Sequence, residues 1–198
     1  MQIVRYPHPA LRRIAKPVRQ VNGDIRRLVE EMIQLMHEGN GIGLAAPQVA
    51  VPLRIVVMNP RRKDEEPGED MVFINPKIKS RRGVVREEEG CLSLPELYAQ
   101  VRRAEWVRLQ AQDRDGNLLE LELEGLPARV IQHETDHLQG ILFIDKLETA
   151  EKIRILPQIR EFERQFRHLQ KEGQIPSNAE LKRQLDELEA AYCEGQTV

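Results

Sequence analysis

Residues 132–140 read QHETDHLQG and contain an H-E-x-x-H pattern. Residues four apart share one face of a helix, so His133 and His137 can bind a single metal ion. The flanking segment is typical of a half-buried helix, with Pro127 near its first turn and Gly140 near its end. We therefore expect a metal site on a central helix, and two imidazoles leave the third ligand open.

Three residues are candidates for that third ligand. Asp136 lies inside the motif but points away from the histidine face of the helix. Asp145 follows the helix, and a turn could bring it back. Cys91 lies in a turn-like stretch, EEEGCLSLP, and a thiolate binds zinc or iron strongly. A lone cysteine is more commonly a small buried apolar residue, so the residues alone place Cys91 ahead without deciding the ligand.

The composition excludes several classes of protein. The 198 residues suffice for one globular domain of ordinary size, and the net charge of −2 argues against a role dominated by nucleic acid or anionic membranes. No apolar run reaches the roughly 18 residues of a membrane span, and the N-terminal segment lacks the apolar core of a signal peptide. With two cysteines, Cys91 and Cys193, and no export signal, we expect a reducing cytoplasm and free thiols.

Hydrophobic periodicity predicts a mixed α+β order of elements. A helix is expected over residues 22–39, with Asn22 or Asp24 capping its start and Gly39 ending it. Glycine, proline and alternation signals predict the other segments. The strands expected are two short buried ones ended by Asn-Pro turns, at 54–60 and 71–78, the beginning of a strand within 83–95, and a hairpin at 104–125. Between them we expect an irregular loop at 41–52 and an exposed charged loop at 61–70.

The pattern becomes helical from Thr149 onward. Pro157 either kinks this helix or begins its main segment. A second helix follows a short linker and starts with a capping box, Ser177 with Glu180. Each helix carries one apolar stripe: Leu156, Ile159, Phe162, Phe166 and Leu169 in the first, and Leu181, Leu185, Leu188 and Tyr192 in the second. We expect a catalytic domain at residues 1–148 and a helical extension at 149–198, packed on that domain or used in self-association.

Three segments together resemble the peptide deformylase family: GIGLAAPQV at 41–49, EGCLS at 89–93 and QHETDHL at 132–138. The resemblance covers roughly residues 1–165 and implies an α+β fold, with short antiparallel or mixed sheets around a central H-E-x-x-H helix and C-terminal helices. It implies that Cys91, His133 and His137 hold a divalent metal. That ion would be Fe2+ in the cell, with Zn2+, Ni2+ or Co2+ found after purification.

The implied reaction is removal of the formyl group from the N-terminal formylmethionine of new polypeptides, with release of formate. Glu134 would move a proton from water to the leaving amine. The side-chain amide of Gln48 and the backbone N–H of Leu92 would stabilise the oxyanion. An extended peptide would bind like an added strand beside an apolar methionine pocket, and the implied substrate-binding residues are Gly41, Ile42, Gly43, Glu88, Glu89, Gly90, Leu126 and Val130.

Other readings remain for some residues and for the whole chain. Val130 would serve equally well in plain core packing, and Tyr98, Arg102 and Arg129 are expected at the rim or the surface. A zinc endopeptidase also uses H-E-x-x-H, and a metal-stabilised module without catalysis would need a fourth protein ligand. The partners we expect are formylmethionyl nascent peptides, the ribosome in a transient contact and a second copy bound through the C-terminal helices, with no membrane.

Overall fold

A computed structural model describes residues 1–61 and 68–194 of the chain. It has one five-stranded antiparallel sheet, in the order β1-β2-β3-β6-β7, and a separate two-stranded sheet of β4 and β5. The strands of the larger sheet are β1 Gly43–Ala45, β2 Ile55–Met58, β3 Met71–Arg82, β6 Trp106–Gln112 and β7 Leu118–Glu124, and those of the smaller are β4 Val85–Cys91 and β5 Leu94–Arg103. The expected α+β class with antiparallel sheets around the motif helix is confirmed.

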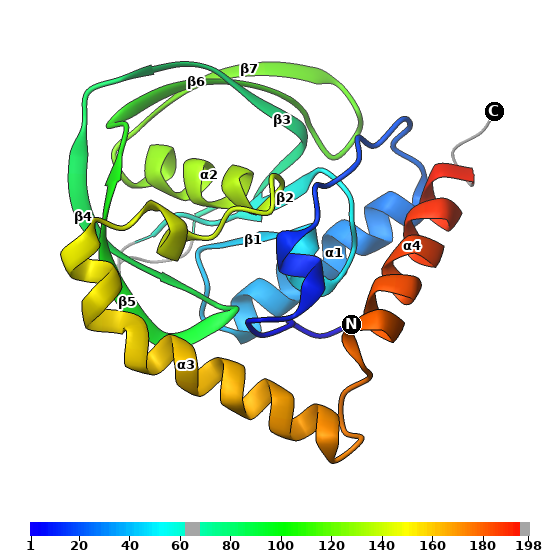
Figure 1. Ribbon diagram of the computed structural model, residues 1–198. Coiled ribbons are helices and arrows are strands. Elements are labelled where there is room, and N and C mark those ends of the chain that lie inside the picture. Colours follow the sequence, from blue (N-terminus) through cyan, green and yellow to red (C-terminus); the bar gives the residue numbers. More distant parts are fainter. Residues whose placement is uncertain (62–67, 195–198) are drawn as a thin grey trace.

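The motif helix, α2 Leu126–His137, is enclosed between the large sheet and the β4–β5 hairpin (Figure 1). It packs on β1, β2 and β7, and Ala128 and Ile131 are fully buried there. Pro127 lies in the first turn, where its missing N–H costs no helical hydrogen bond. Because the helix is covered on both sides, the functional side chains that it carries are held away from bulk water.

The helix expected before the first motif is α1 Gly23–Glu38, with Asn22 as its N-cap and Gly39 as its C-cap. The Asn22 side chain accepts a hydrogen bond from the Ile25 N–H, which satisfies a donor left free at the helix start. The predicted hairpin is also confirmed, as β6 and β7, with the Asp113 carboxylate accepting from the backbone of the turn. Local sequence signals are strong in both places, and the fold follows them.

Two expectations about the strands are wrong, and one strand was not predicted. The predicted turn at Asn75 is instead a bulge inside β3: Asn75 has a φ of 54°, the pairing with β6 shifts register after Ile74, and the strand continues to Arg82. The Asn75 side chain bonds to the backbone N–H and C=O of Val18, which compensates for the interrupted ladder. The loop at 41–52 contains β1 and a 3-10 helix, Ala46–Val49. Strand β5 carried no prediction at all.

Two further helices complete the described part of the chain: α3 Thr149–Lys171 and α4 Asn178–Glu194. Pro157 lies inside α3, so it does not begin a new helix. Ile155 and Phe166 are the buried residues of α3, whereas Leu156 is 41% exposed, so placing Leu156 in the packed stripe was wrong. No helix within residues 1–61 and 68–194 is long and apolar enough to span a bilayer.

Helix α4 lies beside α1 and the N-terminal segment (Figure 1). Leu181 and Leu185 are buried, and the Arg13 guanidinium contacts Asp186 at 2.6 Å and Glu189 at 2.8 Å. Tyr192 packs partly buried against the core cluster that contains α1. The apolar stripe of α4 is therefore covered largely by the chain's own N-terminal third, while Leu188 stays 39% exposed.

Candidate metal centre and active site

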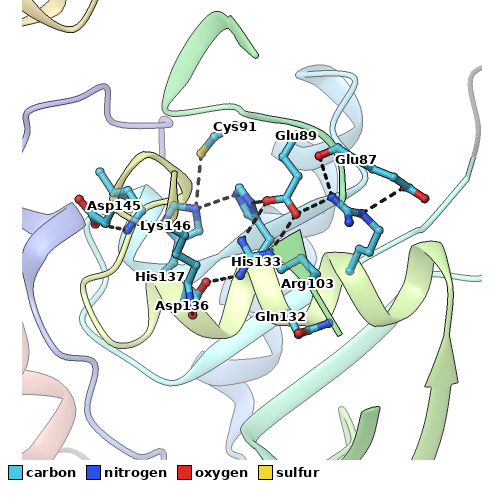
Figure 2. Close-up of polar contacts among 12 residues, drawn as sticks. Glu87, Glu89, Cys91, Arg103, Gln132, His133, Asp136, His137, Asp145 and Lys146 are labelled. Atoms are coloured by element: carbon cyan, nitrogen blue, oxygen red, sulfur yellow. Dashed lines mark hydrogen bonds and ion pairs between the residues drawn. The ribbon is translucent and has the colours of Figure 1, made fainter. Parts of the chain in front are cut away.

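Three donor atoms from two elements meet beside α2. The Sγ atom of Cys91, the last residue of β4, lies 3.4 Å from His137 Nε2, which lies 3.3 Å from His133 Nε2 (Figure 2). All three donor atoms lie within 4.8 Å of one another, and no other group of three such residues gathers in the part of the chain that the structure describes. The structure thus brings together the three residues predicted as ligands.

The spacing of these atoms fits one tetrahedral ion. With metal–nitrogen bonds near 2.0 Å and metal–sulfur bonds near 2.3 Å, a tetrahedron has edges of about 3.3 Å between two nitrogens and about 3.5 Å between nitrogen and sulfur. The observed 3.3 Å and 3.4 Å agree with those edges. Thiolate and imidazole are also the donor types that zinc and divalent iron accept. The residues present therefore fit a divalent metal with one position left for a fourth ligand.

Glu89 orients the imidazole ring of His133 through a contact with its Nδ1 atom. His133 Nδ1 lies 3.1 Å from Glu89 Oε2, which fixes the ring so that Nε2 faces the other donors. Burial alone would raise the pKa of Glu89, but hydrogen bonds from His133 and Arg103 lower it to about 2. Burial likewise opposes protonation of His133, yet its contacts with Cys91 and Glu89 raise its pKa to about 10. Binding of an ion must therefore displace a proton from this cluster.

Glu134, directly after a ligand in α2, points toward the first motif. Its side chain is buried, and its Oε2 atom has no hydrogen-bond partner among the described residues. A Cβ atom added to Gly43 would stand 2.5 Å from Glu134 Oε1, so only glycine leaves space for this carboxylate. Burial raises the pKa of Glu134 to about 7. A carboxyl group with that pKa can both accept and return a proton near neutral pH.

A cleft of about 870 Å³ opens above these residues. Every residue of the predicted site except the fully buried His137 lines it: Gly41, Ile42, Gly43, Gln48, Glu88, Glu89, Gly90, Cys91, Leu92, Leu126, Val130, His133 and Glu134. The floor holds the metal donors, and one wall is apolar, with Ile42, Leu126 and Val130. The arrangement is large enough to accept an extended peptide end with one apolar side chain.

Gln48 is oriented by the backbone beside it. Its Oε1 atom accepts a hydrogen bond of 2.8 Å from the Ala45 N–H, which leaves Nε2 facing Cys91 Sγ and Ser93 Oγ, each at 3.4 Å. Its amide N–H groups therefore point toward the donor cluster. Leu92, the other predicted oxyanion donor, follows Cys91 directly, and its side chain packs over Gly41.

Sequence reasoning missed the charged residues behind the site. Arg103 donates hydrogen bonds of 2.9 Å to both carboxylate oxygens of Glu89 and also pairs with Asp136. Asp136 therefore supports the site through Arg103 and is not one of the three clustered donors. Asp145, the other candidate for the third ligand, lies outside the donor group and pairs with Arg12. Arg129 was expected at the rim, but it is only 4% exposed. One signal was present in the sequence, because Arg129 lies four residues before His133 and shares its helix face.

A Cys-His-His group that can hold a metal ion, next to a buried glutamate in a cleft, is typical of metal-dependent hydrolases. The comparison with known families makes the assignment specific. The sequence model of the polypeptide deformylase family matches residues 1–153, and the chain belongs to this family. Its reaction is the metal-dependent removal of the N-formyl group from newly made peptides. The protease and the non-catalytic module are thereby excluded.

Individual relatives agree with this assignment. A peptide deformylase of Rhodopirellula baltica is 41% identical over 197 residues, which is all of this chain and 98% of the relative. One of Alkalilimnicola ehrlichii is 46% identical over 167 residues, covering 84% and 93% of the two chains. Among solved structures, peptide deformylase 1B of Arabidopsis thaliana superposes with a TM-score of 0.81 at 37% identity, covering 89% of this chain and 96% of that one. The similarity to the first relative continues through the C-terminal helices.

Proposed function

We propose that Cys91, His133 and His137 hold the metal of the deformylase reaction, and that Glu134, Gln48 and Leu92 act on the substrate. The observation that carries this proposal is the donor triangle, with edges of 3.3 Å and 3.4 Å, beside the buried Glu134 carboxylate. A divalent ion held there supplies Lewis acidity, which lowers the pKa of water toward neutrality and polarises a carbonyl.

Glu134 performs the proton transfers. Its carboxylate takes a proton from the water that attacks the formyl carbon, and it gives that proton to the peptide nitrogen as the C–N bond breaks. The products are formate and a free amino terminus. Burial raises the pKa of this carboxyl above its ordinary value, which favours its return of the proton to the leaving amine.

Gln48 and Leu92 stabilise the charge that develops on the formyl oxygen. The Ala45 N–H holds Gln48 Oε1, so the amide cannot rotate away and its Nε2 donors stay aimed at the reacting group. The backbone N–H of Leu92 supplies the second donor. Donors fixed before the reaction need no reorganisation as the oxyanion forms, which is why such groups lower the barrier.

The substrate lies extended along Gly43 on one side and Glu88–Gly90 on the other. Its backbone hydrogen-bonds to these segments like an added strand, with Gly41 permitting close approach. The methionine side chain packs against the apolar wall of the cleft, which is formed by Ile42, Leu126 and Val130. Val130 is only 6% exposed and also belongs to the core cluster beneath α2, so it packs in the core and lines the pocket at once.

We place Fe2+ in this site in the cell, with Zn2+, Ni2+ or Co2+ entering during purification, because thiolate–imidazole sites accept several first-row ions and availability selects among them. Protein reconstituted anaerobically with iron, nickel or cobalt is expected to release formate from a formylmethionyl peptide faster than zinc-loaded protein. The measurement is the rate per bound ion, with metal content determined on the same samples. Equal rates for all four ions would contradict the assignment of iron.

We place the enzyme in the cytoplasm, where formylated chains emerge from the ribosome. Residues 1–148 form the catalytic domain in this proposal, and residues 149–198 form a helical extension. We propose that the extension stabilises the domain by docking, supported by the buried Leu181 and Leu185 and by the Arg13 ion pairs. Self-association and a transient ribosome contact are the alternatives.

Truncation after Gly173 separates these roles. We expect the rate of formate release to stay within about twofold, because no proposed active-site residue is removed. The melting temperature is expected to fall by several degrees, since about 2–4 °C accompanies each kcal/mol in a domain of this size. An unchanged melting temperature would contradict docking: a halved mass in light scattering would then favour a dimer, and weaker co-sedimentation with ribosomes would favour ribosome contact.

A further inference from the structure

Arg129 is a buried cation that the reaction described so far does not use. Its Nη2 group donates to Glu89 Oε1 at 2.9 Å and to the Glu87 carbonyl oxygen at 3.2 Å, and its Nε lies 3.3 Å from the Glu87 carboxylate. All of these partners belong to β4, whereas Arg129 belongs to α2. Arg129 therefore joins the two elements that carry the metal donors.

The contacts between α2 and β4 follow a regular order, because a row of side chains on the helix faces a row on the strand. Arg129, His133 and His137 are spaced by four residues, so they form one face of α2. Glu87 and Glu89 are spaced by two and share one face of β4. The pairing with β5 shifts register between Glu89 and Cys91, and Figure 2 shows all three side chains in a row above the helix. Contacts pair the rows in order: Arg129 with both glutamates, His133 with Glu89, and His137 with Cys91.

The hairpin of β4 and β5 is anchored to α2 at the end of β5, by the Arg103–Asp136 pair and by the Gln132 side chain on the Ala104 backbone, whereas the contacts of Arg129 and His133 join α2 directly to β4. Strand β4 pairs only with β5 among the described strands and lies outside the five-stranded sheet on which α2 packs. Gln48 and the core cluster beside β5 also contact Cys91, and the ionic contacts between the rows add a direct link from β4 to the helix that carries the histidines. Glu89 is central to these contacts. Its Oε1 atom accepts hydrogen bonds from Arg103 Nε and Arg129 Nη2, and its Oε2 atom accepts one from Arg103 Nη2 and lies 3.1 Å from His133 Nδ1.

We infer that Arg129 is a positioning residue of the metal centre. It acts through Glu89, holding that carboxylate against His133 Nδ1 and keeping β4 in register with α2, so that Cys91 Sγ stands beside the two Nε2 atoms before the ion binds. This inference rests on the proposed ligand set.

One atom of Arg129 opposes folding. Arg129 Nη1 is buried and has no hydrogen-bond partner among the described residues. A buried donor without a partner destabilises the folded state, and an apolar side chain of similar length removes that defect. If Arg129 served the fold alone, its replacement would change the melting temperature without a selective effect on metal binding. A positioning role predicts the reverse.

The test compares Arg129→Met, Arg129→Lys and, as a charge-matched control, Arg102→Met. Arg102 lies on β5, the strand paired with β4. Its side chain is 64% exposed and contacts Glu148 at 3.9 Å. Metal-free full-length proteins are titrated with Zn2+ against a chromogenic chelator and with Co2+, whose visible absorption reports the thiolate–imidazole ligands. Melting temperatures of the metal-free forms are measured in parallel.

We expect Arg129→Met to bind Zn2+ about 10–100-fold more weakly, the usual effect of losing a group that orients a ligand. Its cobalt spectrum should be altered and its metal-free melting temperature unchanged or higher. Arg129→Lys should recover part of the affinity, because it restores the charge beside Glu89, and Arg102→Met should match the parent.

Parent-like affinity and spectrum in Arg129→Met would overturn the inference, as would an equal loss in Arg102→Met. If Arg129→Met does not fold, parent-like binding by Arg129→Lys overturns it, and weakened binding by a normally folded Arg129→Lys supports it. A parent protein that binds no metal would instead refute the ligand set itself.

Discussion

Replacing Glu134 with glutamine is expected to leave one metal ion per chain and to lower the rate of formate release by about 10²–10⁴-fold, the usual range for loss of a general acid–base group. Glutamine has nearly the same shape, so it fits beside Gly43 where a larger group would not. It cannot take a proton from water or return one to the leaving amine. Binding and chemistry are therefore separated by a change of one atom.

The measurement is formate release together with elemental analysis of the same Glu134→Gln sample. Glu120→Gln, on the exposed edge strand β7, makes the same chemical change far from the cleft and should behave like the parent. A metal-loaded Glu134→Gln protein with near-parent turnover would remove Glu134 from the mechanism. Loss of the metal together with the activity would show instead that Glu134 supports the site's structure.

Replacing His137 with alanine is expected to abolish both metal binding and turnover. His137 Nε2 contacts Cys91 Sγ at 3.4 Å and His133 Nε2 at 3.3 Å, and the ring is 1% exposed. Removing it leaves two protein donors and opens space that no neighbouring ligand fills. Burial also lowers the pKa of His137, which keeps the imidazole neutral as a ligand must be.

His168→Ala is the matched control, because that histidine is 68% exposed on α3. The control should retain one metal per chain and the parent rate. Circular dichroism of both variants separates loss of the site from loss of the fold. Stoichiometric metal in a folded His137→Ala protein would contradict the ligand set.

The parts of the fold that sequence predicted are those whose signals are local. Helix α1 has an N-cap at Asn22 and a continuous apolar face, and the β6–β7 hairpin has regular alternation and a strong turn. Strand β5 lacks such signals: it begins with Leu94-Pro95, and Glu96 has a φ of 59°. Its pairing with β4 determines its structure. At Asn75 the side chain bonds to the distant Val18 backbone, which no local rule for Asn-Pro can anticipate.

The candidate site divides in the same way. The H-E-x-x-H spacing placed two donors on one helix face, and thiolate chemistry favoured Cys91 among three candidates. The family resemblance decided for Cys91 and supplied Gln48 and Leu92. The network of Glu89, Arg103 and Arg129 escaped prediction because charged residues are usually exposed. Their burial depends on contacts between residues 14 to 44 positions apart. Only the fold brings their charges together, and only then does pairing offset the cost of burial.

Product analysis with freshly purified, anaerobically handled protein and a formylmethionyl peptide tests whether the chain removes formyl groups. Formate and free amino termini are measured in the same reaction, with the N-acetylated peptide as the control. We expect one formate for each new amino terminus, an intact peptide chain and much slower turnover of the acetylated control. Cleavage of an internal peptide bond without formate, or no formate from metal-loaded protein, would contradict this expectation.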